Sequence, residues 1–288
     1  MKKIKTSIEP DKLFDPALMI SILIFLLMFE CHPTSGQDFS NYKVIQMNKA
    51  HLLIPAGYEV NTQNITIVIH LHGKSQLVQD LFIKSKFPFP LITIHLGVFS
   101  SPYRIAFSDT NFLAAILNEA IREIGNDKGV DLSSTKVNLI LTSFSAGYGG
   151  IREILKNETY YQMISAIILL DGLHSDYAFE RNRKIPNPEQ MKDFLRFARD
   201  AVKFKKQFVI THSEIIPEGY SSTTETAQYL IDSTFTEKVF AERKWSDDFV
   251  QKYYAFNGNF RVFGFYGDKA KDHMQHLYNF HRFLELVK

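Results

Sequence analysis

Short apolar runs rich in β-branched residues alternate with helical patterns along most of the chain. Runs that are apolar throughout, each followed by a helix, predict an α/β fold with a mostly parallel central sheet flanked by helices. Long segments at 172–206 and 213–259 separate the later runs and are predicted to be helical inserts. The predicted strands are Tyr42–Met47, His51–Pro55, Ile65–Leu71, Leu91–Leu96, Lys136–Leu141, Ile164–Leu170, Gln207–Thr211 and Phe260–Tyr266. The predicted helices are Phe112–Ile124, Gly147–Lys156, Pro188–Lys203, Ser222–Asp232, Thr236–Tyr254 and His273–Val287.

Residues 1–36 carry a different pattern. Ala17–Phe29 is almost wholly apolar, and its 13 residues are fewer than the roughly 20 that span a bilayer but suit a signal peptide. Thr34–Gly36 offers small residues for cleavage, and Cys31 stands where a lipoprotein is acylated, although Glu30 suits that motif poorly. We therefore expect a signal peptide or a membrane or lipid anchor over residues 1–36 and the folded domain over 37–288. The protein is expected to be exported, and to be periplasmic, envelope-associated or secreted.

Composition and charge exclude several classes of protein. The 288 residues are 45% hydrophobic and 22% charged, which is a globular composition that allows one large domain or two small ones. The net charge is only +2 and no block of Lys and Arg occurs, so nucleic acid is not expected as a partner. The single cysteine excludes an internal disulfide and a zinc site built from several cysteines.

The most specific chemical signal follows the strand Lys136–Leu141. Thr142–Gly150 reads TSFSAGYGG and leads into a helix, so Ser145 lies at a sharp strand-to-helix turn. This segment matches the nucleophile motif G-x-S-x-G except that Ser143 replaces the first glycine. Ser145 is therefore the predicted nucleophile, and the alternative is a small-residue turn without chemistry.

With this motif the sequence resembles the α/β-hydrolase superfamily from about Tyr42 to its C-terminus. Four segments carry the resemblance: IHLHGK, SFSAGYGG, LLDG and GDKAKDHMQHL, which begin at Ile69, Ser143, Leu169 and Gly267. The resemblance implies an α/β-hydrolase fold and a triad in the chain order serine, carboxylate, histidine. The superfamily includes esterases, lipases, peptidases and non-catalytic members, so the fold does not determine the substrate.

A serine nucleophile needs a histidine to accept its proton. The superfamily places this histidine after the last strand, which here leads to His273. His276 and His281 compete with it but lie deeper in the closing helix, and His276 is expected on the helix surface. His273 and His276, three residues apart, also have the spacing of two metal ligands on one helix.

The histidine in turn needs a carboxylate to orient it. Asp171 ends the strand after the nucleophile, where a carboxylate is costly to bury unless it is used or hydrogen-bonded. Glu214 follows the next strand, where most α/β hydrolases place their acid, and Asp268 is near His273 in sequence. We predict Asp171 as the acid, with Glu214 as the alternative.

Further candidates lie at the ends of the predicted strands. The N–H after the nucleophile, that of Ala146, is predicted to hold the oxyanion, and the resemblance implies a second donor in the loop after His72-Gly73, most simply Lys74. No H-x-x-x-H or H-E-x-x-H motif occurs, so no metal or other cofactor is expected. The alternative is that histidines at strand ends bind zinc together with Asp171. These histidines are His72, His95, His174, His212 and His273. The predicted substrate-binding residues are His72, His174, His212 and Tyr148.

The sequence thus predicts an exported serine hydrolase that cleaves a small or medium polar ester through an acyl-enzyme, with an amide as the alternative substrate. Its N-terminus offers a route to membrane association. One alternative is a non-catalytic binding protein of the cell envelope with the same fold. The other is a histidine-rich, metal-assisted hydrolase.

Overall fold

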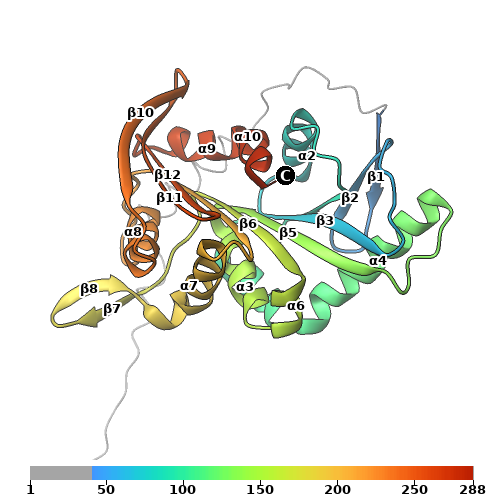
Figure 1. The fold of residues 1–288 in the computed structure, drawn as a ribbon, viewed down its shortest axis with the longest axis horizontal. Helices are drawn as coiled ribbons and strands as arrows, with labels where there is room; N and C mark the ends of the chain where they lie inside the picture. The colour runs from blue at the N-terminus through green and yellow to red at the C-terminus, as the bar shows by residue number, and fades with distance from the viewer. Residues whose placement is uncertain (1–40, 288) are drawn as a thin grey trace, which may run out of the picture. The chain divides into compact units, whose positions relative to one another are not determined.

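A ten-stranded sheet forms the centre of the computed structural model, which describes residues 41–287 (Figure 1). The strand order is β1-β2-β4-β3-β5-β6-β9-β12-β11-β10. Neighbours from β4 to β12 pair in parallel, whereas the strands at both edges pair antiparallel. The strands are β1 (Tyr42–Gln46), β2 (His51–Pro55), β3 (Asn64–Leu71), β4 (Leu91–Ile94), β5 (Lys136–Phe144), β6 (Ile164–Leu170), β9 (Gln207–His212), β10 (Lys238–Ser246), β11 (Phe249–Asn257) and β12 (Phe260–Phe265).

Helices cover both faces of this sheet and bury two apolar cores (Figure 1). The smaller core includes Phe82 and Phe280 and lies under α2, α9 and α10, whereas the larger core lies under α3 to α8. Because both faces are covered, the central strands are apolar throughout, and in β6 every residue except Ser165 is buried. The helices are α2 (Ser75–Lys84), α3 (Ser100–Ser108), α4 (Thr110–Lys128), α5 (Tyr148–Leu155), α6 (Glu158–Met163), α7 (Pro188–Val202), α8 (Thr223–Ser233), α9 (Ala270–Tyr278) and α10 (Phe280–Leu284).

The predicted fold class is confirmed: a mostly parallel central sheet is flanked by helices. Side chains cap the starts of two predicted helices, because Asp109 accepts a hydrogen bond from the N–H of Asn111 and Ser222 accepts one from the N–H of Glu225. The sequence pattern missed α2, α3 and α6. It also missed a separate hairpin, β7 (Tyr177–Glu180) with β8 (Arg183–Pro186).

The prediction of a helix over Thr236–Tyr254 is wrong. This segment forms β10 and most of β11, so the later insert is only partly helical. In β11 buried residues alternate with more exposed ones, and the buried set begins with Phe249, Gln251 and Tyr253. This period of two is typical of a strand with one buried face. Pairing with β12 determines which residues of β11 face the interior.

The predictions for the N-terminus, which include Ala17–Phe29, Cys31 and the boundary after Gly36, lie outside the described residues. Within residues 41–287, no helix combines the length and the apolar character that crossing a membrane requires.

Candidate active site

Ser145 lies at a strained turn between β5 and α5. Its φ is 47°, in the left-handed region that a residue with a side chain adopts at a cost, and one 3₁₀ turn separates it from α5. A Cβ atom on Gly147 would lie 2.2 Å from the carbonyl oxygen of Leu71. A Cβ atom on Gly172 would lie 2.3 Å from the carbonyl oxygen of Ser145 itself. Glycine is required at both positions because neighbouring backbone approaches the turn so closely.

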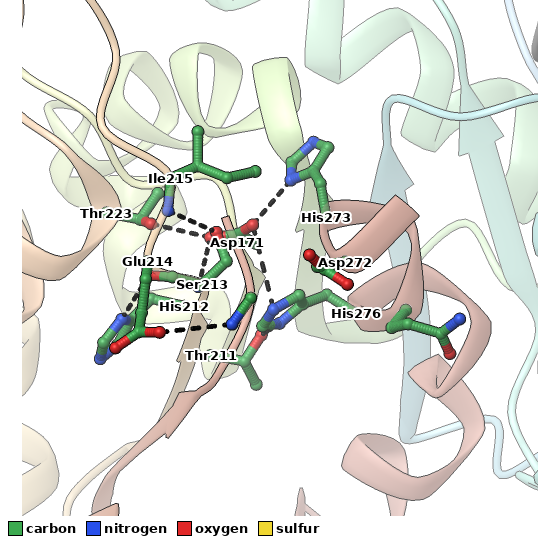
Figure 2. A network of polar contacts seen from close by, with 12 residues as sticks. Asp171, Thr211, His212, Ser213, Glu214, Ile215, Thr223, Asp272, His273 and His276 are labelled. Carbon is green, nitrogen blue, oxygen red and sulfur yellow. Dashed lines mark hydrogen bonds and ion pairs between the residues drawn. The ribbon is translucent and has the colours of Figure 1, made fainter. Parts of the chain in front are cut away.

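Asp171 and His273 form a short hydrogen bond although 102 residues separate them (Figure 2). His273 Nδ1 lies 2.7 Å from Asp171 Oδ2. Asp171 follows β6 with a φ of 43°, and His273 lies in the first turn of α9. The structure therefore brings together the two residues that the sequence assigns as acid and base.

Two donors from the β9–α8 region hold the other oxygen of Asp171. Its Oδ1 accepts from the N–H of Ser213 at 2.8 Å and from the hydroxyl of Thr223 at 2.7 Å. Asp171 is only 1% exposed, so these donors replace the water that the carboxylate loses on burial. They also fix the plane of the carboxylate and hence the direction of Oδ2.

The charge state of Asp171 results from two opposing effects. Burial alone raises its pKa, but attraction by His276 and His273 and hydrogen bonds from His273 and Ser213 outweigh burial. Together they hold the pKa of Asp171 well below its usual value of 3.8. The carboxylate is therefore ionised at neutral pH and can stabilise a positive charge on His273.

The ring of His273 lies beside the strand that ends at the serine. Its centroid is 4.5 Å from that of Phe144, the residue before Ser145, and its side chain is 11% exposed. Hydrogen bonding between His273 and the Ser145 hydroxyl stays a prediction, and the position of His273 against Phe144 supports it.

Glu214, the alternative acid, is engaged elsewhere. Its carboxylate lies 2.6 Å from Lys252 Nζ and accepts from the N–H of Gly267 at 3.4 Å. The N–H of Glu214 donates to the carbonyl of Gly267 at 2.8 Å, so Glu214 joins the loops after β9 and β12. The geometry therefore favours Asp171 over Glu214 as the triad acid.

The loop after β3 carries one of the two predicted oxyanion donors. His72 and Gly73 have φ values of 74° and 118°, and Lys74 is the N-cap residue of α2. His70 Nε2 lies 2.8 Å from the carbonyl oxygen of His72, to which it donates. This contact holds the backbone turn that leads to the N–H of Lys74. The second predicted donor, the N–H of Ala146, directly follows Ser145 in the 3₁₀ turn.

Two of the predicted substrate-binding residues touch each other. The ring of His174 packs edge-on against Tyr148 at 5.6 Å and against Tyr220 at 5.1 Å. His174 Nδ1 lies 2.9 Å from the carbonyl oxygen of Ser221, so Nδ1 carries a proton, and burial lowers the pKa of the ring. A neutral His174 therefore offers Nε2 as a hydrogen-bond acceptor, three residues after Asp171.

The other two predicted substrate-binding residues, His72 and His212, are buried in internal contacts. His72 Nδ1 lies 3.1 Å from both the Gly97 carbonyl oxygen and the Tyr103 hydroxyl, and burial lowers the pKa of His72 to about 4. His212 Nε2 lies 2.6 Å from the Tyr253 hydroxyl, and its Nδ1 lies 3.0 Å from a backbone carbonyl. Because both nitrogens of His212 have partners within the protein, we do not assign it to substrate.

His276 is buried next to Asp171, a position that the sequence did not predict. It is 1% exposed, not on the helix surface as predicted, and its Nε2 lies 3.9 Å from Asp171 Oδ2. The prediction failed because α9 turns this side chain toward the sheet, where it packs edge-on against the stacked rings of Phe249 and Phe265. The available signal was its spacing from His273, since residues three apart share a helix face.

The histidines do not form a metal site in the described part of the chain. Within residues 41–287, no group of three His, Cys, Asp or Glu side chains is arranged to hold a metal ion. The metal-assisted alternative therefore has no ligand set in this range.

Solved structures of esterases resemble this structure at low sequence identity. A mutant of an esterase called rPPE is 13% identical, and the match covers 98% of this chain and 92% of that chain with a TM-score of 0.45. An acetyl xylan esterase from Aspergillus awamori is 11% identical, with 83% and 99% covered and a TM-score of 0.41. An arylesterase is 11% identical, with 95% and 99% covered and a TM-score of 0.44. No protein-family model and no curated protein matches the chain.

These TM-scores lie below 0.5, so the fold follows from the sheet and its helices and not from the similarities. The chain has the mostly parallel sheet flanked by helices that the sequence predicts. Ser145 lies at a strand–turn–helix within it, as the nucleophile motif predicts.

Proposed function

We propose that this chain is a serine hydrolase that cleaves an ester, with an amide as the alternative substrate, through an acyl-enzyme intermediate. The observation that carries the proposal is the 2.7 Å hydrogen bond between His273 and the buried Asp171. It lies beside a turn that holds Ser145 in a strained, left-handed conformation. Strain of this kind clusters at functional sites.

Each residue of this triad has one task. Ser145 Oγ attacks the carbonyl carbon of the ester while His273 takes the hydroxyl proton. Asp171 accepts a hydrogen bond from the Nδ1–H of His273, which directs Nε2 toward that proton and stabilises the resulting imidazolium. The N–H groups of Ala146 and Lys74 stabilise the negative charge that develops on the carbonyl oxygen.

The second half of the reaction reverses these proton transfers. His273 gives its proton to the departing alcohol as the bond between the carbonyl carbon and the alcohol oxygen breaks, which leaves the acyl group on Ser145. A water molecule then attacks the acyl carbon while His273 takes one of its protons. The acid is released and Ser145 regains its proton.

We propose a polar substrate of small or medium size. Tyr148 follows Ser145 by three residues and His174 follows Asp171 by three, so their cluster with Tyr220 lies close to the proposed chemistry. The Nε2 acceptor of His174 and two phenol rings suit an ester that carries a hydroxyl donor on an otherwise compact body.

Labelling with a fluorophosphonate tests the proposal, because this probe reacts with an activated serine. We expect one adduct on Ser145, no adduct in Ser145→Ala, and retained labelling in the neighbouring control Ser143→Ala. A chain that takes no label and hydrolyses no p-nitrophenyl ester would instead be a non-catalytic binding protein.

We further propose that the protein is exported, from the apolar run Ala17–Phe29 and the small residues that follow it. The intact mass of protein isolated from its native cells tests this proposal. Cleavage near Gly36 and a lipid on Cys31 give different masses, and the mass of the unprocessed chain would contradict both.

A further inference from the structure

A second histidine lies behind the proposed triad and has no part in the reaction described above. His276 Nε2 is 3.9 Å from Asp171 Oδ2, the same oxygen that accepts from His273 (Figure 2). Its ring packs edge-on against Phe249 at 5.1 Å and against Phe265 at 5.2 Å. A polar ring in such an apolar place is costly unless its nitrogens have partners.

The two polar neighbours of the ring, Thr211 and Asp171, together indicate where His276 carries its proton. The hydroxyl oxygen of Thr211, a fully buried residue, lies 2.7 Å from His276 Nδ1. If Thr211 donates to Nδ1, the imidazole proton is on Nε2 and faces the Asp171 carboxylate. The opposite tautomer turns a lone pair of Nε2 toward a negative charge, which is electrostatically unfavourable. Burial lowers the pKa of His276 to about 4, so the ring is neutral at neutral pH.

We propose that His276 is a positioning residue for the triad, an inference that rests on the proposed function. The Nε2–H of His276 polarises Asp171 Oδ2 and so limits how tightly Asp171 holds the protonated His273. In each cycle His273 must gain a proton and release it to the leaving alcohol. Without the second N–H, Asp171 binds the imidazolium more tightly and proton release slows.

The other histidines that surround this pair carry no competing charge at neutral pH. Burial lowers the pKa of each histidine among them, so these rings are neutral there. They are His174 from the loop after β6 and His212 from the end of β9, which face Asp171, and His72 from the loop after β3, which faces His273. Lys238 and Glu214 lie beyond His212 and act on it with opposite sign.

Two substitutions of His276 distinguish the effect of its N–H donor from the effect of its size. His276→Phe fills the same space without a donor, whereas His276→Gln keeps one donor and one acceptor. For His276→Phe we expect kcat for methyl acetate, whose leaving alcohol must take the proton, to fall about tenfold with KM unchanged, and the acid limb of the kcat/KM profile to move to higher pH. His276→Gln is expected to recover most of this loss. A parental kcat and pH profile in His276→Phe would overturn the proposal, and so would equal losses in both variants.

Nitrogen-15 NMR of the unsubstituted chain tests the same proposal without a variant that has to fold. We expect the neutral Nε2–H tautomer of His276 at pH 7, and the Nδ1–H tautomer would overturn the proposal. Turnover that survives in Ser145→Ala would refute the proposed serine mechanism and would leave the measured tautomer unchanged. The two failures are therefore distinguishable.

Discussion

Replacement of Asp171 by asparagine exchanges one oxygen for an amide nitrogen and is expected to remove most activity from a folded protein. The amide oxygen can keep the hydrogen bonds from Ser213 and Thr223, because both partners are donors. The amide nitrogen then takes the place of Oδ2, where it faces the Nδ1–H of His273. Two donors cannot bond, so His273 adopts the other tautomer, with its proton on the nitrogen that Ser145 needs as an acceptor.

The size of the effect follows from this loss of the correct tautomer. We expect kcat to fall about 10⁴-fold, the size measured when a triad aspartate becomes asparagine, which corresponds to about 5.5 kcal/mol of transition-state stabilisation. The cost to folding is smaller. A hydrogen bond to a charged group contributes about 1.5–3 kcal/mol, so the free energy of unfolding should fall by about that amount.

Steady-state hydrolysis of p-nitrophenyl acetate measures the first effect, and urea unfolding followed by circular dichroism measures the second. Glu214→Gln is the matched control, because it makes the same chemical change in a carboxylate that binds Lys252. The control is expected to keep kcat within about twofold, since such partly exposed ion pairs contribute little. Parental kcat in Asp171→Asn together with loss of activity in Glu214→Gln would refute the assignment of the acid.

Three further predictions follow from buried groups around the site. Burial lowers the pKa of His70 to about 3 and that of His276 to about 4, below the unfolded value, so their contribution to stability is complete above about pH 6.5 and is lost as the pH falls. Between pH 7 and pH 5, urea unfolding is expected to show a total decline of about 1.9 kcal/mol for each group, and equal stabilities would contradict it. Ser143→Ala is expected to raise the free energy of unfolding by up to about 1 kcal/mol at unchanged kcat, because the buried Ser143 hydroxyl has no hydrogen-bond partner within residues 41–287, and a lower unfolding midpoint would speak against this. Gly172→Ala is expected to lower kcat at least about 100-fold, because its Cβ would lie 2.3 Å from the Ser145 carbonyl oxygen, and parental kinetics would exclude this close approach.

The central sheet and the turn at Ser145 could be predicted from sequence because both depend on local signals. A strand that is buried on both faces forms a continuous apolar run in the sequence, whichever elements pack against it. In β6 every residue except Ser165 is apolar. The turn at Ser145 requires small residues close by, and the contact of Gly147 with the backbone of Leu71 explains that requirement. The pairing of Asp171 with His273 was predicted from chain order in a resembling superfamily, not from any local pattern.

The features that sequence reasoning missed depend on contacts between distant segments. Aromatic and charged residues are interspersed along Thr236–Tyr254, and this local pattern is compatible with a helix. The strand register of β11 is imposed by its pairing with β12. His276 reads as a surface residue until α9 is packed against the sheet, where Thr211 supplies its partner from 65 residues away. Tertiary contacts decided both cases against the local pattern.

A covalent acyl group on Ser145 distinguishes the proposed mechanism from every alternative considered for this site. Rapid acid quenching of the full chain during hydrolysis of p-nitrophenyl acetate, followed by peptide mass spectrometry, detects such an intermediate. We predict one acetyl group on the peptide that contains Ser145, and none on that peptide in Ser145→Ala. Sustained turnover with an unmodified Ser145, or with the acetyl group on another residue, would contradict the mechanism.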